Sequence, residues 1–584
     1  MKQRARLHWF GISCLLVASC TQLRDPDQIF GDVDTGGAGA TAAGHAGQAE
    51  ISGAGNSGGL EDSAGTGPNG GGAPQAGSST VGKGGSSGDA GAPNADCNDE
   101  TGFNGLGCYS CAPKDIATLE NACTDAACTP FGSKRLTLLG ADGKLPALPP
   151  PAGAGGAGGA PNAGGAGGAG GAGGAGGAGG AGGAGGATGT GKACAEVAKN
   201  GGTLVYITGS SAAGTLLKVI AKQLASQGIY IVYESTGSCV GVDAVLNGTP
   251  MLTSGPTAPA TSATYWDSAN SDGVACDLPT DGVTADIGVS DVFAQSCTGF
   301  EFATLDGVRD AHGPIQTMAF AVPSNSAYKE ISAEAAYSVF GFGASGGVKD
   351  ATGAPMWNNE ESLFKRSATS GTQVMLAAAI GVPAGVWKGK PLKGSPDVAS
   401  ALITAGQKQE TANAALGILA ADYIDSNTLR AQLRMLAFQD TGQHCAVTPD
   451  STTNAKDKAN VRDGHYPVWG PLHLLLRVDA QGNPLNPVTR KAVSDIVGYL
   501  SGTKALPNGL QLIEIYAQSG LVPECAMHVT RTKDGGNIAP YHAPAPCSCL
   551  FDSKLGLKVS CSSCTKQADC AAQETCSLGY CEPE

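Results

Sequence analysis

The sequence predicts an α/β domain over residues 194–535, in which helices cover a parallel sheet. Two observations predict this fold class. Apolar runs alternate with amphipathic runs along the stretch, and its first elements follow the order strand, helix, strand. The stretch is also longer than one hydrophobic core usually allows, so we expect two lobes.

The first elements of this domain have the clearest pattern. Residues 203–208 form an apolar run typical of a buried strand, and residues 229–233 form a second one. Between them, residues 214–227 place their leucines and isoleucine on one face, which predicts an amphipathic helix. Parallel strands need a crossover connection of this kind, so the three elements predict a βαβ unit.

The N-terminus predicts an export signal. The first six residues carry three basic side chains and no acid. The apolar run at 9–18 that follows is shorter than the ~20 residues that span a bilayer. The run ends in LVAS before Cys20, and this end resembles the lipobox of bacterial lipoproteins. The resemblance implies cleavage before Cys20 and acylation of that residue, palmitate included. An ordinary secretory signal with a chance cysteine is the alternative.

An acylated Cys20 would anchor the protein outside the cytoplasm, at a membrane surface. Inner-membrane lipoproteins of Gram-negative bacteria usually carry Asp after the cysteine, whereas Thr21 stands here. We therefore expect the outer membrane or the cell surface rather than the inner membrane. Of the 20 cysteines, Cys14 would leave with the signal and Cys20 would carry the lipid. The remaining 18 allow up to nine disulfides in an oxidising compartment.

Composition divides the chain into six segments. Tracts rich in Gly, Ala and Ser lack the apolar content that would offset the entropy of ordering, so they predict disordered tethers. The formal charge of −14 becomes −17 once the signal is removed, which argues against nucleic acid as a partner. We expect a lipoprotein signal peptide at 1–19, a disordered Gly/Ala/Ser-rich tether at 20–96, a small Cys-rich module at 97–145, a Gly-Gly-Ala linker at 146–193, the α/β domain at 194–535 and a Cys-rich C-terminal module at 536–584.

The C-terminal module holds seven cysteines and few apolar residues, so disulfides must replace a core. Because seven is odd, one of these cysteines must pair outside the module or stay free. Zinc is the alternative, since Cys561 and Cys564 would form half of a tetrahedral site. Cys576 and Cys581 are loosely compatible with the other half. An oxidising compartment favours disulfides.

The segment with the most chemical information is residues 364–373, FKRSATSGTQ, which precede an amphipathic stretch. Ser370, or the threonine before it, can cap a helix whose first N–H groups carry partial positive charge. Gly371 lets a ligand approach the backbone, and Thr372 adds a hydroxyl. Arg366 can fold back as a bidentate clamp. Together these features predict a site for a phosphate-like anion. A capped surface helix with a nearby arginine is the alternative.

Three further segments point to the same edge of the sheet. Gly/Ser-rich loops at 208–214 and 235–241 follow the first two predicted strands, and a third short strand ends at Asp291. Open α/β sheets bind ligands at the carboxyl ends of their strands. We therefore expect both loops and Asp291 near the anion. A helix N-cap is the alternative role for Asp291.

These four segments, in this order, resemble periplasmic phosphate-binding proteins of ABC importers over about residues 202–530. That family has Thr-Gly-rich, Ser-Gly-Gly, Asp-Phe-Gly-x-Ser-Asp and Arg-x3-Ser-Gly-Thr segments, and residues 465–476 look like its Tyr-Pro-Leu-Trp strand. The resemblance implies the type 2 two-lobed periplasmic-binding-protein fold. Lobe 1 would hold about 202–312 and 430–530, and lobe 2 about 313–429.

The resemblance also implies the ligand-binding residues. Asp291 would accept the proton of hydrogen phosphate and would repel sulfate, which carries no proton at neutral pH. The other residues would donate hydrogen bonds or charge to the anion: Ser210, Ser211 and Ser238 from lobe 1, and Arg366, Ser370, Gly371 and Thr372 from lobe 2. The first loop departs from the family, because Ala212 and Ala213 stand where a hydroxyl and a bulky side chain are usual. Either Ser210, Ser211 or Thr215 substitutes, or one donor is missing.

The sequence thus predicts an extracytoplasmic, lipid-anchored solute-binding protein that captures phosphate or a similar oxyanion for ABC-type uptake or sensing. An ABC permease would be its protein partner, and we expect no cofactor. The alternative is a surface lipoprotein that reuses the binding fold for structural, adhesive or sensory purposes without transport. Long tethers and Cys-rich ends favour that alternative.

An enzyme is the third class of protein that we weighed. Gly343-x-Ser345-x-Gly347 matches a nucleophile-elbow pattern, but turn residues follow it where a helix is required. The histidines are scattered, and neither His312 nor His473 has a ligating partner at helical spacing. We therefore expect neither a catalytic site nor a metal site.

Overall fold

The computed structural model describes residues 103–104, 108–109, 116–124, 129–150, 192–198, 201–252, 263–267, 270–297, 306–453 and 455–583. The predicted signal peptide, Cys20, the tether at 20–96 and most of the linker at 146–193 lie outside these residues. In the part of the chain that is described, no helix is both long and apolar enough to cross a membrane.

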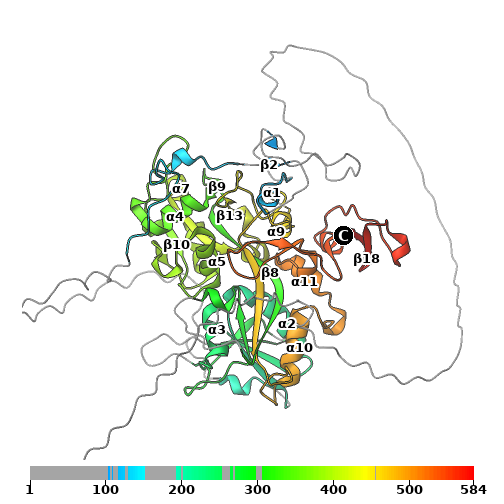
Figure 1. The fold of residues 1–584 in the computed structure, drawn as a ribbon. Helices are drawn as coiled ribbons and strands as arrows, with labels where there is room; N and C mark the ends of the chain where they lie inside the picture. Colours follow the sequence, from blue (N-terminus) through cyan, green and yellow to red (C-terminus); the bar gives the residue numbers. More distant parts are fainter. Residues whose placement is uncertain are drawn as a thin grey trace, which may run out of the picture. The chain divides into compact units, whose positions relative to one another are not determined.

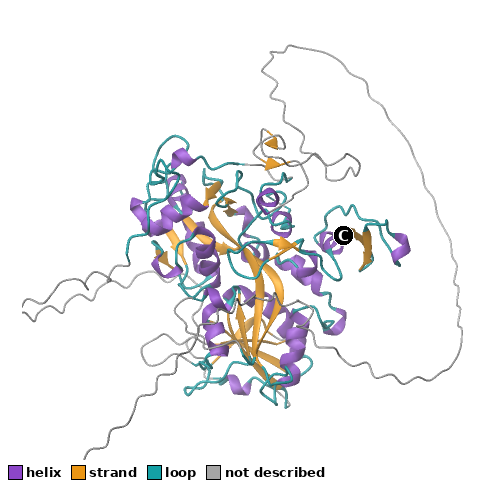
Figure 2. Ribbon diagram, viewed as in Figure 1, coloured by secondary structure: helices purple, strands orange, loops and turns teal. Residues whose placement is uncertain are grey.

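A mixed sheet of 11 strands forms the centre of the α/β domain (Figure 2). Its strands follow the order β11-β10-β12-β8-β15-β7-β3-β4-β5-β6, and β13 pairs with β8 beside this path. The strands are β3 (Thr203–Gly209), β4 (Ile229–Ser235), β5 (Ala263–Asp267), β6 (Asn270–Cys276), β7 (Ile287–Ser290), β8 (Val308–Pro323), β10 (Leu363–Lys365), β11 (Lys390–Pro391), β12 (Leu416–Ala420), β13 (Leu433–Met435) and β15 (Trp469–Arg477).

Helices flank this sheet, and four small two-stranded sheets lie beside it. The helices are α1 (Ile116–Glu120), α2 (Gly214–Ala225), α3 (Ser238–Leu246), α4 (Ala333–Phe342), α5 (Gly371–Ile380), α6 (Ser395–Ala405), α7 (Gln409–Ala414), α8 (Ala421–Ser426), α9 (Ala459–Arg462), α10 (Arg490–Leu500), α11 (Leu512–Ser519) and α12 (Ser548–Lys554). The small sheets pair β1 (Phe103–Asn104) with β2 (Cys108–Tyr109), β9 (Glu330–Ser332) with β14 (Ala437–Gln439), β16 (Val529–Thr530) with β17 (Ala539–Pro540), and β18 (Glu574–Ser577) with β19 (Tyr580–Pro583).

The predicted βαβ unit is confirmed. β3 and β4 pair in parallel, and α2 connects them. The face of α2 that packs on the sheet buries Leu217, Ile220 and Leu224, each at most 1% exposed. These side chains join those of the strands in one apolar core. The 3.6-residue spacing of apolar side chains therefore located the helix correctly.

The expectation of a parallel sheet holds only in part. β3 is parallel to β4 and β7, and β10 is parallel to β11 and β12. By contrast, β8 is antiparallel to β15 and to β12. The reason is that the chain leaves the first set of strands through β8 and returns through β15, so these two long strands run in opposite directions.

β8 is the strand that joins the two lobes. Its first ten residues, Val308–Thr317, pair with β15, and its last six, Met318–Pro323, pair with β12 and β13. Figure 1 shows β8 extending from the strands beside α2, α3 and α10 towards those beside α4 and α5. Each lobe thus contains an α/β layer that includes one end of β8.

Six disulfides are described with both of their cysteines, and Cys123 and Cys445 are disulfide-bonded as well. Cys194–Cys276 and Cys239–Cys297 lie within the first lobe, and Cys525–Cys547 joins the α/β domain to the C-terminal module. The module itself contains Cys549–Cys561, Cys564–Cys576 and Cys570–Cys581. Cys547 is therefore the odd cysteine of the module 536–584, and it pairs outside the module, which is one of the two outcomes that the odd count allowed.

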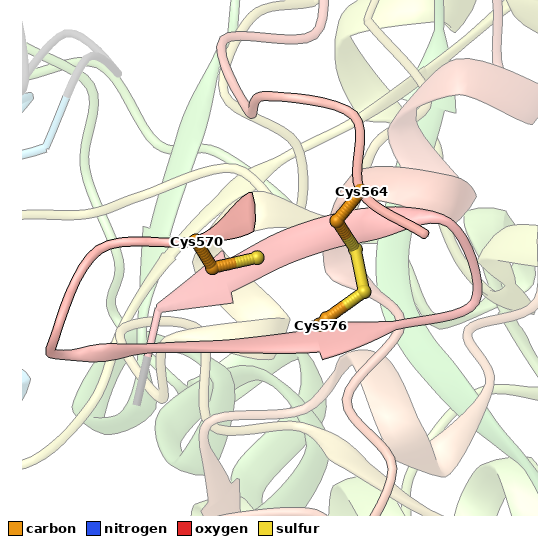
Figure 3. Close-up of side chains that lie close together, drawn as sticks. All are labelled: Cys564, Cys570 and Cys576. Atoms are coloured by element: carbon orange, nitrogen blue, oxygen red, sulfur yellow. A yellow bond between two sulfur atoms is a disulfide. The ribbon is translucent and has the colours of Figure 1, made fainter. Parts of the chain in front are cut away.

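The zinc alternative for this module is not supported. Cys564, Cys570 and Cys576 do lie close enough to hold a metal ion, but Cys564 and Cys576 share a disulfide (Figure 3). Cys570 is bonded to Cys581 in the same way. A disulfide sulfur has no thiolate to offer a metal, so disulfides are the staples of this module.

Part of the N-terminal Cys-rich segment packs on the second lobe. Phe131 and Leu136 belong to the core of that lobe, and Leu136 forms a backbone bridge with Val348. Nη1 of Arg135 lies 2.7 Å from Oε1 of Glu330. Residues 129–150, the described part of the chain that includes Phe131, Arg135 and Leu136, therefore contribute to the stability of this lobe.

Candidate functional site

The candidate site begins at the carboxyl ends of β3 and β7 and the N-terminus of α3. Because β3 and β7 are parallel neighbours, Ser210 and Asp291 leave the sheet at the same edge. Ser210 Oγ donates a hydrogen bond to Oδ1 of Asp291. Ser238 Oγ donates to Oδ2 at 3.1 Å and accepts from the N–H of Asp291 at 3.1 Å. All three side chains are at most 2% exposed.

The second lobe supplies Arg366, which follows β10 and is 4% exposed. Its Nη1 donates to Ser395 Oγ at 3.0 Å, and its Nη2 donates to the carbonyl oxygen of Lys393 at 3.2 Å and to Ser211 Oγ at 3.3 Å. Its Nε is buried and has no hydrogen-bond partner among the residues that the structure describes. The guanidinium therefore keeps a donor for a further acceptor.

The N-terminus of α5 faces the carboxylate of Asp291. Ser370 is the N-cap residue, and its side chain makes no capping hydrogen bond. The first N–H groups of a helix have no intrahelical acceptor and carry partial positive charge. A Cβ at Gly371 would lie 2.2 Å from Ser238 Oγ and 2.5 Å from Oδ2 of Asp291. Glycine is thus the residue that lets the second lobe approach this closely.

The two lobes are in contact at this site. The N–H of Cys239, in the first turn of α3, donates to the carbonyl oxygen of Thr369 at 3.1 Å. The hydrogen bond from Arg366 to Ser211 also crosses between the lobes. The structure therefore shows the lobes closed at Asp291, with the N-termini of α3 and α5 both close to its carboxylate.

Burial controls the charge of Asp291. Burial raises the pKa of this carboxyl to about 6, while hydrogen bonds from Ser210 and Ser238 and the charge of Arg366 act in the opposite direction. Asp422 in α8 is a second buried acid close to it. Burial and the charge of Asp291 raise the pKa of Asp422, and its Oδ1 has no partner among the described residues. Arg366 thus faces a site that is rich in carboxyl groups.

The structure brings the predicted ligand residues together, and it shows what two of the serines contact; their role as anion ligands stays a prediction. Ser210 and Ser238 each have one proton, and both give it to Asp291. They therefore support the acceptor. Ser211 keeps its own proton, because it accepts from Arg366. Thr372 lies in the first turn of α5 and is 2% exposed.

The N-cap alternative for Asp291 is wrong. The next helical turn, Ala294–Ser296, has Phe293 at its N-cap position. The nucleophile-elbow pattern also has another explanation. Gly343–Ser345 forms a 3-10 turn directly after α4, whereas a nucleophile elbow follows a strand.

Sequence reasoning missed Ser395 and Asp422. Ser395 is the first residue of α6, and Pro396 and Asp397 follow it, which is a usual pattern at a helix start. That pattern was available in the sequence. Asp422 lies in a short helix after β12, and only the packing of this helix shows that the acid is buried.

Replacing Gly371 by alanine is expected to weaken anion binding about ten- to a hundredfold. The added methyl group would overlap Ser238 and Asp291 in the closed arrangement, and overpacking of this kind costs about 1–3 kcal/mol. Calorimetry with phosphate would measure the loss. Gly385→Ala is the matched control, because a Cβ there meets nothing within 4 Å. Equal affinities for the two variants would contradict this prediction.

No family model matches the sequence, and no curated protein matches it. Among solved structures, an ABC-type phosphate transport receptor from Vibrio cholerae is similar, with 13% identity and a TM-score of 0.33, over 55% of this chain and 99% of that chain. A phosphate-binding protein from Stenotrophomonas maltophilia has 14% identity and a TM-score of 0.32, over 55% of this chain and 90% of that chain.

The class of protein follows from the strand order. The long strand β8 belongs to the sheets of both α/β lobes, and a buried polar site lies where the lobes meet. This is the two-lobed periplasmic-binding-protein fold of type 2, as the sequence predicts.

Proposed function

We propose that this chain is an extracytoplasmic, lipid-anchored solute-binding protein that captures phosphate, or a phosphate-like oxyanion, between its two lobes. The observation that carries this proposal is the convergence of Arg366 and the N-terminus of α5 on Asp291. Burial strengthens electrostatic interactions, so a charged guanidinium with a free donor favours an anion at this position. The N-termini of α3 and α5 add N–H groups and positive dipole ends.

Asp291 would select among anions. At neutral pH it is ionised, so a dianion beside it is repelled unless the ligand brings a proton to share. Hydrogen phosphate brings one, whereas sulfate does not. Ser210 and Ser238 would hold the carboxylate in place, since each donates a hydrogen bond to it. Selectivity would then come from repulsion of the wrong ligand.

Opening of the lobes would admit the anion, and closure would bury it, as in other proteins of this architecture. No bond is made or broken in this proposal. The lipid on Cys20 and the tethers before the α/β domain would hold the binding domain at a membrane surface, in keeping with a chain that contains disulfides. An ABC permease would receive the anion.

Isothermal titration calorimetry on the full chain in phosphate-free buffer tests the proposal. We expect phosphate to bind with about micromolar affinity, which corresponds to about −8 kcal/mol. Sulfate should bind far more weakly. Absence of both heat and a shift in melting temperature on adding phosphate would refute the proposed ligand.

The preference for phosphate over sulfate should fall about ten- to a hundredfold in the Asp291→Asn variant. Asparagine offers an amide N–H where the carboxylate repels sulfate, and one unpaired polar group is worth about 1–3 kcal/mol. In the unmodified chain, the same preference should decline as the pH falls through about 6, because Asp291 then becomes protonated and can donate. Competition titrations between pH 5 and 8 would measure both effects. A preference that stays constant in the variant would rule out Asp291 as the selective group.

A surface lipoprotein that does not transport is the second candidate function. The disulfide-stapled C-terminal module favours it, because anion capture needs no such module. Nη1 of Arg462 lies 2.6 Å from Oδ1 of Asp552, so this module is attached to the α/β domain by an ion pair as well as by Cys525–Cys547. Phosphate binding in calorimetry would favour capture, and its absence would favour this second candidate.

A further inference from the structure

Three side chains that commonly bind metal ions lie together on the ladder between β8 and β15. They are Asp310, His312 and His473, and the ligating atoms that they offer lie within 4.8 Å of one another. None of them belongs to the anion site proposed above. The sequence did not predict this cluster, because His473 is far from the other two residues along the chain.

Strand pairing explains the cluster. Asp310 and His312 are two residues apart on β8, so their side chains point to the same face of the sheet. His473 on β15 lies directly opposite His312. The register shifts between Pro471 and His473, and this irregularity places the second histidine on the face of the first. Helical spacing in the sequence could not show this pair, because the two histidines lie on different strands.

The histidines are held in place by their neighbours. Nδ1 of His473 lies 2.8 Å from Oδ2 of Asp310, and its ring is 5.1 Å from that of His312. Phe293 packs edge-on against both rings, at 4.5 Å from His473 and 6.4 Å from His312. Because these neighbours restrict the rotamers of both histidines, the cluster is preorganised for a ligand.

One atom of the cluster is unsatisfied. Nε2 of His473 is buried and has no hydrogen-bond partner among the residues that the structure describes, and the residue is 1% exposed. A buried polar atom without a partner costs about 1–3 kcal/mol, so native proteins rarely keep one without a reason. A metal ion would satisfy this nitrogen.

The electrostatic surroundings suit a cation. The carboxylate of Asp310 belongs to the cluster, and those of Asp291 and Asp534 lie within electrostatic range of His473. The Asp310 side chain is 37% exposed, so an ion from solvent can reach the cluster past it. Two imidazoles and one carboxylate are a common ligand set for zinc that leaves one position open.

We propose that Asp310, His312 and His473 form a binding site for a divalent cation of the zinc class. The ion would cross-link β15 to β8, the strand that joins the two lobes. Asp310 lies against Nδ1 of His473. An ion on Nε2 would therefore leave Asp310 to orient the ring through Nδ1, and an outer partner of this kind strengthens metal binding. This inference is independent of the proposed capture of phosphate.

Zinc titration of the full chain tests the proposal. The chain is first treated with EDTA, and isothermal titration calorimetry is run in phosphate-free buffer. We expect one Zn²⁺ per chain at this site. Asp310→Asn and His312→Gln should each weaken binding about tenfold or more. Substitution with Co²⁺ should give the visible absorption of a histidine-bound ion, and this absorption should be lost in the His312→Gln variant.

His528→Gln is the matched control, because Nδ1 of His528 lies 2.6 Å from Oδ1 of Asp463 in a similar His–Asp pair outside the cluster. It should leave the zinc affinity unchanged. Melting temperatures in EDTA show whether each variant is folded, and the partly exposed Asp310 is the substitution least able to disturb the core. If the unmodified chain binds no zinc, or if all three variants bind it equally well, the proposal is overturned.

Discussion

Replacing Arg366 by alanine is expected to weaken phosphate binding by about 3–5 kcal/mol, which is a loss of a hundredfold to several thousandfold. Arg366 is the nearest cation to Asp291, and its Nε is the buried donor without a partner among the described residues. Without it, an anion that enters the closed site would be buried beside two acids and no cation. Alanine also removes the hydrogen bonds to Ser211 and Ser395.

Calorimetry with phosphate would measure this loss, with Arg434→Ala as the matched control. Arg434 lies in the same lobe and donates to backbone carbonyl oxygens of Ser324 and Ser326, at 2.6 and 2.8 Å. It has no contact with the anion site among the contacts described for it. We expect the control to keep its affinity. Similar affinities for Arg366→Ala and the unmodified chain would show that the anion, if bound, lies elsewhere.

Replacing Lys458 by methionine is expected to lower the free energy of unfolding by about 3–5 kcal/mol. Lys458 is fully buried, and its Nζ lies 2.7 Å from Oδ2 of Asp425 and 3.0 Å from Oδ1 of Asp450. Burial alone would lower the pKa of this lysine, but the two aspartates raise it by more, so it stays charged. Methionine keeps most of the volume and removes the charge, which leaves Arg430 as the single cation for two buried carboxylates.

Thermal and urea unfolding would measure this effect. Lys504→Met is the control, because Lys504 also pairs with an aspartate but its side chain is 43% exposed. An exposed pair is worth about 0–1 kcal/mol, so the control should unfold almost as the unmodified chain does. Equal losses of stability in the two variants would mean that burial of the ion cluster does not determine its contribution to the free energy of unfolding.

The sequence by itself determined the local elements of the first lobe. The strands β3 and β4 were predicted from short apolar runs, and the helix α2 from apolar side chains that recur every 3.6 residues. Both patterns are visible without any contact. The start of α5 was visible for a similar reason. Helix N-termini are specified by a few neighbouring residues, among them Ser370 and Gly371.

The odd number of cysteines in the C-terminal module was also a property of the sequence alone. An odd number of cysteines shows that one of them must pair outside the module or stay free, but it does not show which one. The structure identifies it as Cys547, which pairs with Cys525. Pairing depends on which sulfur atoms the fold brings together, and counting cannot supply that.

Only the tertiary structure decided the role of each site residue. Ser210 and Ser238 were predicted as anion ligands, and the tertiary structure adds that both hydroxyls donate to Asp291. Asp422 and the pair formed by His312 and His473 were not predicted as parts of any site. Their positions depend on strand register and on how the lobes pack, which join residues far apart in the chain. The local periodicity of the sequence contains no information about such contacts. These contacts determine which buried polar groups have a hydrogen-bond partner.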